Sequence, residues 1–280
     1  MDKTLLTQIS FYDKIEMEVF MKKLFFLSLL ACALFFSCSK RSDEDISLKK
    51  VQDAGVFVLG LDDSFPPMGF RDENNEIVGF DIDLAKEVAA RLGVELKTQP
   101  IDWASKEQEL ATGNIDCIWN GFTITPERQK ALLFSGPYLN NAQVVVVRAD
   151  SEISSIENLA GKRVALQAGS TALNALNENS ELKSSLSEVV ELRDNLTAFM
   201  ELNQRTVDAV ILDEVVARYN ISKSDYPFVV LPDTLASEEY AIGFRKKDVQ
   251  LRDAVQNQLN TMVGDGTMLK ITAKWFGGQN

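Results

Sequence analysis

Three positions in the chain place charged or anion-binding groups where a folded protein could present them to a small ligand. Arg128 lies in the first turn of a predicted helix, where a guanidinium can hold a carboxylate with two parallel hydrogen bonds. Ser170 and Thr171 follow Gly169 at the start of another predicted helix, where free backbone N–H groups and the helix dipole favour an anion. Asp213 ends a predicted strand, which is where ligands of open α/β sheets bind, and its carboxylate can pair with an ammonium. Together these groups could bind a small zwitterion.

Each of these signals also has a purely structural explanation. An arginine in a first helical turn can be a surface charge, a Gly-Ser-Thr sequence can be a helix cap, and an aspartate after a strand can form a turn. No one of them identifies a site by itself, so their meaning depends on the fold that carries them.

Composition argues against several classes of function. The 280 residues are 45% hydrophobic and 25% charged, which is typical of a soluble globular protein with one large or two medium domains. A formal net charge of -12 argues against a nucleic-acid partner, because phosphates attract a basic surface. The absence of histidine removes the commonest general base and most zinc sites, which argues against hydrolases and metalloenzymes. We expect no catalytic residues, no metal and no cofactor.

Strand-like and helix-like segments alternate through the first half of the chain. The apolar run 56–60 is typical of a buried strand, and the turn-rich segment 62–67 after it could face a ligand. Residues 81–92 carry apolar side chains at helical spacing and end at Gly93, which suits the left-handed conformation after a helix. Further strands are expected at 95–99 and 116–119, with helices at 105–111 and from Thr125 onward. This alternation predicts a doubly wound α/β lobe.

The same alternation begins again after a β-rich run at 143–148. Strands are expected at 162–167, 189–192 and 207–212, with helices that open at 169–171 and span 195–202. A return strand at 240–245 precedes two amphipathic helices at about 249–262 and 267–275. Because no low-complexity linker separates the halves, we predict lobe 1 from 48–141 plus 238–280 and lobe 2 from 142–237. Strands that cross between the lobes would let them hinge about a cleft.

Four motifs, in this order, resemble one known family. They are GFDIDLAKEVAARL (79–92), GFTITPERQKALLFSGPY (121–138), VALQAGST (164–171) and VDAVILDE (207–214). These segments resemble the extracellular solute-binding proteins of family 3, which serve ABC importers of polar amino acids, and the resemblance covers about residues 48–276. It implies an α/β fold of the two-lobed, periplasmic-binding-protein-like type (type II), with a ligand cleft between the lobes. It further implies a monomer that binds a free amino acid and delivers it to an ABC permease and its ATPase.

The resemblance also implies a role for each matching position. Arg128 would bind the α-carboxylate together with the backbone at Thr123 and Thr171. Asp213 would take the α-ammonium, with help from the backbone carbonyl of Gly121.

The side chain of the ligand would meet aromatic and polar residues. Phe65 and Trp103 match the positions at which the family has aromatic residues that clamp the ligand side chain. Asp62 and Asn120 would contact the polar end of that side chain. Core packing is the alternative for Phe65 and Trp103, and Asp62 could equally be a turn residue. An acid here suits a cationic side chain such as that of lysine, arginine or ornithine, yet in the family it also serves neutral amides. We therefore expect a polar amino acid, with basic ones among the candidates.

The N-terminal segment has the features of a bacterial lipoprotein signal. Met21 and two lysines precede the apolar run 24–36, which is typical of a secretory signal and too short to span a bilayer. The small residue before Cys38 resembles a lipobox, so we expect a signal peptide at 21–37, a palmitate-bearing Cys38 and a tether at 38–47. Residues 1–20 lack signal character, which favours an upstream extension with Met21 as the true start.

Two alternatives stay open at this end of the chain. Cys32 is a competing lipidation site, and Cys38 is favoured because apolar residues continue beyond Cys32 whereas charge begins right after Cys38. The other alternative is an ordinary signal peptide with an incidental cysteine. A lipid anchor would hold the protein at the cell membrane, facing the periplasm or the cell exterior. Only Cys117 would then remain, which excludes an intramolecular disulfide and favours a small buried side chain.

Two other functions compete with ligand capture. The resemblance also covers periplasmic dehydratases that act on cyclic amino-acid precursors, and their sites need a general acid or base in place of the zwitterion clamp. Because Arg128, Thr171 and Asp213 are all kept, binding is favoured over this cyclohexadienyl-type reaction. A ligand-sensing module of a larger receptor is disfavoured, because little sequence follows Trp275.

Overall fold

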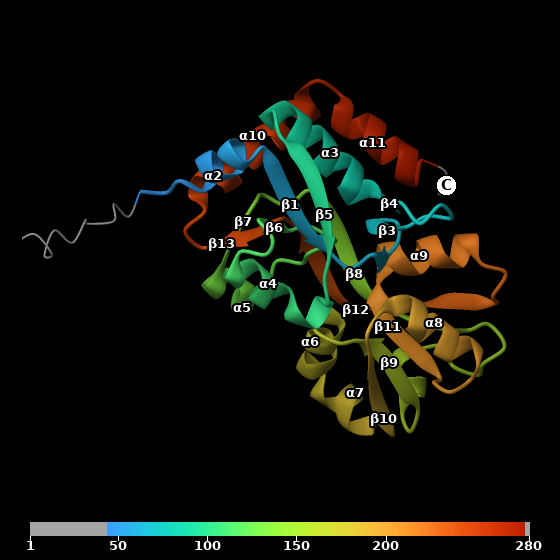
Figure 1. The fold of residues 1–280 in the computed structure, drawn as a ribbon. Helices are drawn as coiled ribbons and strands as arrows, with labels where there is room; N and C mark the ends of the chain where they lie inside the picture. Colours follow the sequence, from blue (N-terminus) through green and yellow to red (C-terminus); the bar gives the residue numbers. More distant parts are fainter. Residues whose placement is uncertain (1–43, 278–280) are drawn as a thin grey trace, which may run out of the picture. The chain divides into compact units, whose positions relative to one another are not determined.

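Two five-stranded sheets organise residues 44–277, which the computed structural model describes (Figure 1). The first sheet has the order β5 (Glu95–Pro100), β1 (Val56–Leu61), β6 (Cys117–Ile118), β13 (Gly243–Arg245) and β7 (Leu132–Phe134). β1 runs parallel to β5 and β6, and β13 runs antiparallel to β6 and β7. The three parallel strands β5, β1 and β6 form one side of this sheet and require the crossover helices that the sequence alternation predicts.

The second sheet has the order β10 (Glu188–Leu192), β9 (Arg163–Gln167), β11 (Ala209–Asp213), β8 (Leu139–Arg148) and β12 (Phe228–Tyr240). β9 is parallel to β10 and β11, whereas β8 is antiparallel to β11 and β12. Near the first sheet lies a small three-stranded sheet of β2 (Ser64–Phe65), β3 (Gly69–Arg71) and β4 (Ile77–Val78).

Helices connect these strands. They are α2 (Ser47–Ala54), α3 (Phe80–Leu92), α4 (Lys106–Thr112), α5 (Pro126–Ala131), α6 (Thr171–Glu178), α7 (Ser180–Ser185), α8 (Asn195–Asn203), α9 (Glu214–Lys223), α10 (Val249–Gly264) and α11 (Thr267–Phe276), with short 3-10 turns at Trp103–Ser105 and Ile156–Leu159. α10 and α11 pack against α3 over the first sheet, as Figure 1 shows. Two local signals match the predicted boundaries: α3 ends at Gly93 with φ 73°, and the Thr125 side chain caps α5.

The chain passes twice between the two large sheets. β7 leads into β8 on the way out, and β12 leads into β13 on the way back. β8 and β12 pair with each other from Leu139↔Tyr240 to Phe228↔Arg148, so the two crossings lie side by side. The lobe boundaries expected at 142 and 238 stay a prediction, since the paired strands reach beyond both.

β12 is the largest departure from the sequence-based expectation, which placed a single strand at 240–245. Residues 241–242 interrupt that strand, and β12 extends back to Phe228 through Pro232. Register shifts between Val230 and Ala236 accommodate this proline, and β12 lies at the edge of its sheet, where a residue without an N–H is tolerated. Edge strands with bulges lack a clear alternation of apolar residues, which is why the pattern did not predict it.

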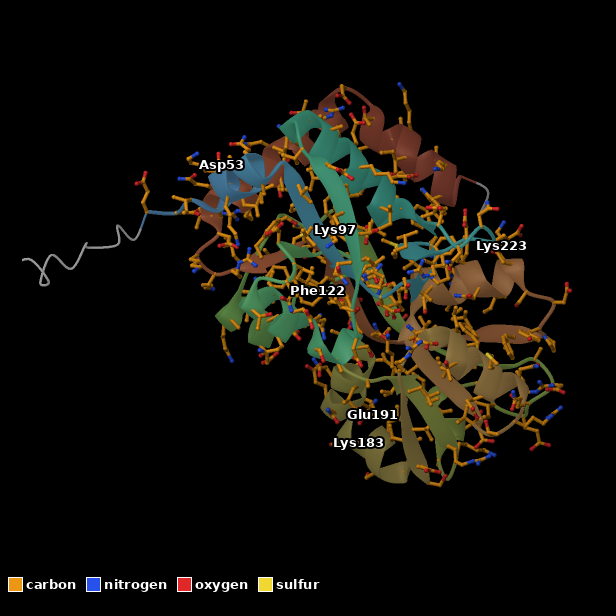
Figure 2. The ribbon with its side chains drawn as sticks, viewed as in Figure 1. Asp53, Lys97, Phe122, Lys183, Glu191 and Lys223 are labelled. Atoms are coloured by element: carbon orange, nitrogen blue, oxygen red, sulfur yellow. The ribbon has the colours of Figure 1, made fainter. Side chains whose placement is uncertain are left out.

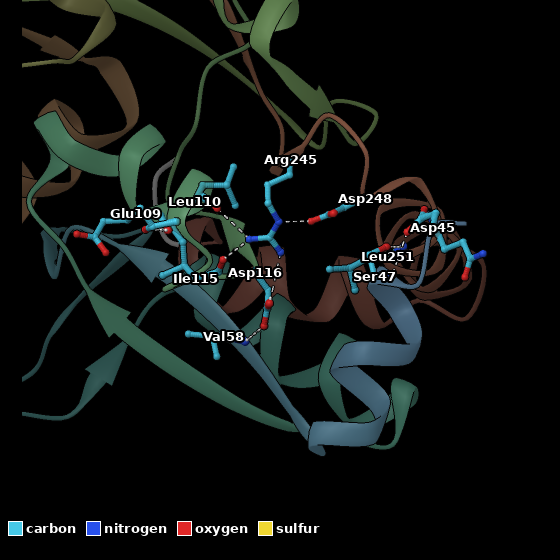
Figure 3. A network of polar contacts seen from close by, with 12 residues as sticks. Asp45, Ser47, Val58, Glu109, Leu110, Ile115, Asp116, Arg245, Asp248 and Leu251 are labelled. Atoms are coloured by element: carbon cyan, nitrogen blue, oxygen red, sulfur yellow. Dashed lines mark hydrogen bonds and ion pairs between the residues drawn. The ribbon is translucent and has the colours of Figure 1, made fainter. Parts of the chain in front are cut away.

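Arg245 at the end of β13 holds the start of β6 in place (Figure 3). Its Nη1 donates to the carbonyl oxygens of Leu110 at 2.9 Å and Ile115 at 2.7 Å. Its guanidinium also lies 3.6 Å from the Asp116 carboxylate and 2.5 Å from that of Asp248. These contacts fix the end of α4 against the first sheet, and β6 leads directly into the loop that carries several predicted site residues.

Cys117 in β6 is fully buried, as expected, and burial raises the pKa of its thiol well above the usual range. Within residues 44–277, no helix has both the length and the apolar character needed to cross a bilayer. The expected signal peptide at 21–37, the upstream extension, and the candidate lipidation sites Cys32 and Cys38 lie outside the described residues.

Candidate functional site

Most of the predicted site residues lie at or just after the ends of strands of the two large sheets. Asp62 follows β1, Trp103 follows β5, and Asn120, Gly121 and Thr123 follow β6. On the other side, Ser170 and Thr171 follow β9, and Asp213 ends β11. Contacts between the two sides include Gln167 Nε2 to Asp62 at 2.6 Å, Thr171 Oγ1 to Thr123 Oγ1 at 3.4 Å, and Arg128 Nη2 to the Gly169 carbonyl at 3.5 Å. The fold therefore brings the residues of the predicted site together.

Arg128 is not an exposed surface charge. Its side chain is only 11% exposed, and its guanidinium lies over the Phe122 ring at 4.3 Å. Phe122 is fully buried and is labelled in Figure 2. Nη1 donates to the Thr123 carbonyl at 2.8 Å, while Nε lies 3.8 Å from Glu107. A guanidinium has five N–H donors, so these contacts leave donors for a ligand carboxylate.

Asp213 is buried at the end of β11. Its Oδ1 accepts hydrogen bonds from Asn141 Nδ2 at 2.6 Å and from the Tyr240 hydroxyl at 2.7 Å. Burial, followed by the nearby charge of Glu238, raises the pKa of this carboxyl to about 7. A cation placed beside Asp213 would favour its ionised form, so the group is suited to bind an ammonium.

Gly121 and Thr123 shape the loop between these charges. Gly121 has φ +55°, and a Cβ there would lie 2.8 Å from the Phe65 ring, so this position requires glycine. Thr123 is buried, with its carbonyl oxygen bound to Arg128 and its hydroxyl bound to Glu238 at 3.0 Å.

The loop after β9 uses its two hydroxyl residues differently. Ser170 Oγ donates to the Gln167 carbonyl at 2.7 Å, so this hydroxyl supports the loop that precedes α6. Thr171 is buried, and its Oγ1 accepts a hydrogen bond from Gln143 Nε2 at 3.3 Å. The start of α6 thus lies against Thr123 and the crossing strand β8.

Asp62 and Asn120 form a second polar cluster. Asp62 is 8% exposed and accepts from Gln167 Nε2 at 2.6 Å and from the backbone N–H of Ser64 at 2.9 Å. Its own N–H donates to Asn120 Oδ1 at 3.1 Å. Burial raises the pKa of the Asp62 carboxyl to about 6. Asp62 is therefore more than a turn residue, because its carboxylate joins the two sides of the site.

Both predicted clamp residues are buried. Phe65 is 5% exposed and packs against the hydrophobic core of the first sheet. Trp103 is 7% exposed and meets Phe122 edge to face with ring centroids 5.9 Å apart. These contacts fit core packing as well as a clamp, so the clamp stays a prediction.

Lys106 is a site residue that sequence reasoning missed. It is 2% exposed, and its Nζ donates to the Trp103 carbonyl at 3.0 Å and, from the other side of the site, to the Gly169 carbonyl at 2.9 Å. Burial, followed by the positive charge of Arg128, lowers the pKa of this ammonium to about 8. A lysine in a helical pattern normally indicates a solvated face, so no local signal distinguishes it.

Asp81 at the start of α3 is a second missed residue. It is fully buried, and its Oδ2 accepts from the Gly121 N–H at 2.7 Å and from the Tyr138 hydroxyl at 2.9 Å. Burial raises the pKa of this carboxyl to about 7. Its place in the first motif, GFDID, was the available signal, but an acid in a first helical turn is ordinarily explained by the helix dipole.

Within the described part of the chain, no group of three or more metal-ligating side chains occurs.

Comparison with known proteins defines the class. Residues 57–278 match the family model described as bacterial extracellular solute-binding proteins, family 3. The chain belongs to this family, and its fold is the two-lobed type II periplasmic-binding-protein fold, as expected.

Several particular relatives are named for amino acids. The chain is similar to the arginine-binding extracellular protein ArtP of Bacillus subtilis, with 33% identity over 92% of this chain and 100% of that protein. It is 28% identical to the L-cystine-binding protein TcyJ of Escherichia coli over 90% of this chain and 94% of that protein. Among solved structures, an ABC uptake transporter substrate-binding protein from Streptococcus pneumoniae with bound histidine superposes with a TM-score of 0.81 at 34% identity, covering 84% of this chain and 98% of that one.

Proposed function

We propose that this chain captures a free polar amino acid between its two lobes and delivers it to an ABC permease and its ATPase, acting as a monomer without a cofactor. The observation that carries this proposal is a guanidinium that is only 11% exposed and a buried carboxylate, linked by a chain of hydrogen bonds that begins at Thr123. Arg128 binds the Thr123 carbonyl, while the Thr123 hydroxyl binds Glu238, which shares the Asn141 amide with Asp213. A free α-amino acid carries its ammonium and its carboxylate on the same carbon atom, so a guanidinium and a carboxylate linked by one short hydrogen-bond chain suit it.

The side-chain end of the site favours a polar and preferably basic ligand. Asp62 is buried, and with a pKa of about 6 it is mainly ionised at neutral pH. A cationic or amide group on the ligand would add a partner for this buried charge, whereas an apolar side chain would remove water from the carboxylate without replacing it by a donor. Relatives named for arginine and histidine support this choice, and the relative named for cystine keeps a larger polar side chain among the candidates.

A thermal-shift screen with the twenty common amino acids, cystine and ornithine tests the proposal, with calorimetric titration of each hit. We expect at least one basic or amide-bearing amino acid to raise the melting temperature, because a ligand that binds only the folded state stabilises it. Des-amino and des-carboxy analogues of that hit should give little shift. A flat screen, or equal shifts with analogues that lack either charge, would overturn the proposal.

The same preparation separates binding from catalysis. One structural neighbour, an ancestral amino-acid-binding protein, is described as a precursor of cyclohexadienyl dehydratase, with a TM-score of 0.76 at 35% identity over 82% of this chain and 99% of that one. We expect prephenate-like compounds to be recovered unchanged after incubation, because the zwitterion-binding residues Arg128, Thr171 and Asp213 are all present. Enzyme-dependent release of carbon dioxide and water from such a compound would contradict this.

The affinity for an amino acid should fall as the pH is lowered below about 7. Asp213 has a pKa of about 7 without ligand, and a bound ammonium favours its ionised form and lowers that pKa. Between the two pKa values, protons compete with the ligand, and the affinity should change by up to about tenfold per pH unit. Calorimetric titrations from pH 5.5 to 8 with a ligand whose side chain is uncharged measure this effect. Asp213→Asn should flatten the profile, and a wild-type profile that is already flat would contradict the prediction.

We further propose that Cys38 carries palmitate and holds the protein at the cell membrane, facing the periplasm or the exterior. The support is the apolar run 24–36 that ends just before Ser37 and Cys38. Cells that express wild-type, Cys38→Ala or Cys32→Ala protein can be labelled with a palmitate analogue. We expect the label to be lost in Cys38→Ala and kept in Cys32→Ala. Label that persists in Cys38→Ala and is lost in Cys32→Ala would show that Cys32 is the lipidated residue. Absence of label in all three proteins would show that the segment is an ordinary signal peptide.

A further inference from the structure

Glu238 on β12 places a second carboxylate beside Asp213. Its Oε2 accepts hydrogen bonds from Thr123 Oγ1 at 3.0 Å, from Asn141 Nδ2 at 3.1 Å and from Gln143 Nε2 at 3.0 Å. The same Asn141 nitrogen donates to Asp213 Oδ1 at 2.6 Å. The two carboxylates therefore share one amide nitrogen as a donor. The distance between Asp213 Oδ1 and Glu238 Oε2 is at most the sum of the two hydrogen-bond lengths.

The contacts of Glu238 decide which way the Thr123 hydroxyl points. An ionised carboxylate only accepts hydrogen bonds, so the single proton of the Thr123 hydroxyl must be donated to Glu238. The Thr123 oxygen is then an acceptor, and Thr171 Oγ1 is already one donor to it at 3.4 Å. This hydroxyl cannot donate to a ligand carboxylate, but its remaining lone pair can accept from an ammonium.

The charges around Thr123 are unbalanced without a ligand. Arg128 supplies one positive charge on the carbonyl side, whereas Asp213 and Glu238 supply two carboxylates on the hydroxyl side. Within the described residues, no hydrogen bond takes up the second carboxylate oxygen of Glu238, and Arg128 bonds to the Thr123 carbonyl and not to either carboxylate. Two neighbouring carboxylates repel each other, and a cation placed between them removes that cost.

We propose that Glu238 is the second anionic group of the ammonium subsite, where it acts with Asp213 and through the Thr123 hydroxyl to select ligands that carry an α-ammonium. This inference rests on the proposed function and adds a residue to its site. Glu238 contributes its negative charge directly and also positions Thr123 as an acceptor. A ligand with a keto, hydroxyl or methylene group in place of the ammonium gains nothing from either effect.

Glu238→Gln tests this role, with Glu239→Gln as the matched control. Glutamine keeps the shape and an acceptor oxygen for Thr123, Asn141 and Gln143, but it removes the charge. Glu239 is the next residue on β12 and is exposed. Calorimetry should measure the best amino acid of the screen and its des-amino analogue on the wild type and on both variants.

We expect Glu238→Gln to weaken binding of the amino acid by about tenfold or more, because a charge-assisted contact is lost. The des-amino analogue should bind Glu238→Gln no more weakly than it binds the wild type, so the preference for the ammonium shrinks. Glu239→Gln should keep the wild-type preference. If Glu238→Gln does not fold, Glu238→Asp replaces it in the experiment. Aspartate keeps the charge on a shorter side chain, so this variant should show a preference for the ammonium that is smaller than that of the wild type but still present.

The outcomes separate this inference from the proposed function. A wild type that binds no amino acid would overturn both. A wild type that binds, with Glu238→Gln indistinguishable from Glu239→Gln, would overturn the role of Glu238 alone. Equal weakening of both ligands in Glu238→Gln would assign Glu238 a purely structural role and also overturn the inference.

Discussion

Arg128→Ala should weaken amino-acid binding by roughly 30-fold or more, a loss of about 2–5 kcal/mol. The side chain is 11% exposed and lies over the Phe122 ring, so in its absence a bound carboxylate would face a buried space without its charged donor. Arg128→Lys should not restore the affinity, because an ammonium cannot supply two parallel donors or stack as a plane on the ring. Calorimetric titration with the best ligand of the screen measures both variants.

Lys130→Ala is the matched control for this experiment. Lys130 lies on the same helix, α5, but its side chain is 78% exposed, so its loss should leave the affinity unchanged and alter stability by no more than about 0.5 kcal/mol. Near-wild-type affinity in a folded Arg128→Ala protein would refute the carboxylate site. A loss of affinity that is equally large in Lys130→Ala would point to a general electrostatic effect.

Asp81→Ala should lower the free energy of unfolding by about 2–4 kcal/mol, because it leaves the Gly121 N–H and the Tyr138 hydroxyl without their buried acceptor. The Gly121 loop carries three predicted site residues, Asn120, Gly121 and Thr123, so ligand affinity should fall as well. Urea unfolding followed by circular dichroism measures the stability. Asp53→Ala is the control, because Asp53 is exposed on α2 and pairs only with Lys49 (Figure 2).

The loss of unfolding free energy caused by Asp81→Ala should also depend on pH. The pKa of Asp81 is raised to about 7 in the folded protein, from a usual value of 3.8. A raised pKa means that its contribution to stability is fully present below about pH 4 and is lost as the pH rises through about 7. The difference between wild type and Asp81→Ala should therefore be larger at pH 5 than at pH 8. A difference that grows with pH would show that Asp81 is held as a stabilised anion, contrary to this prediction.

The alternating α/β architecture, the family and the local structure around Arg128 could be predicted from the sequence alone. Apolar periodicity and turn residues are local properties, and they located α3 and its end at Gly93. The cap at Thr125 and the proline after it located the helix that carries Arg128, which is also a local effect. The strand β12 was missed because an edge strand interrupted by Pro232 has no regular pattern to detect.

Which charged residues are buried, and which groups they face, depends on the tertiary fold. Lys106 and Gly169 are 63 positions apart, and Thr123 and Glu238 are 115 apart, so no sequence window contains both partners. Whether a lysine or a glutamate is solvated or buried depends on the surfaces that fold over it, and its local pattern is the same in both cases. The charge balance around Thr123 is for this reason a property of the assembled fold, since it arises where loops of the first sheet meet the crossing strands.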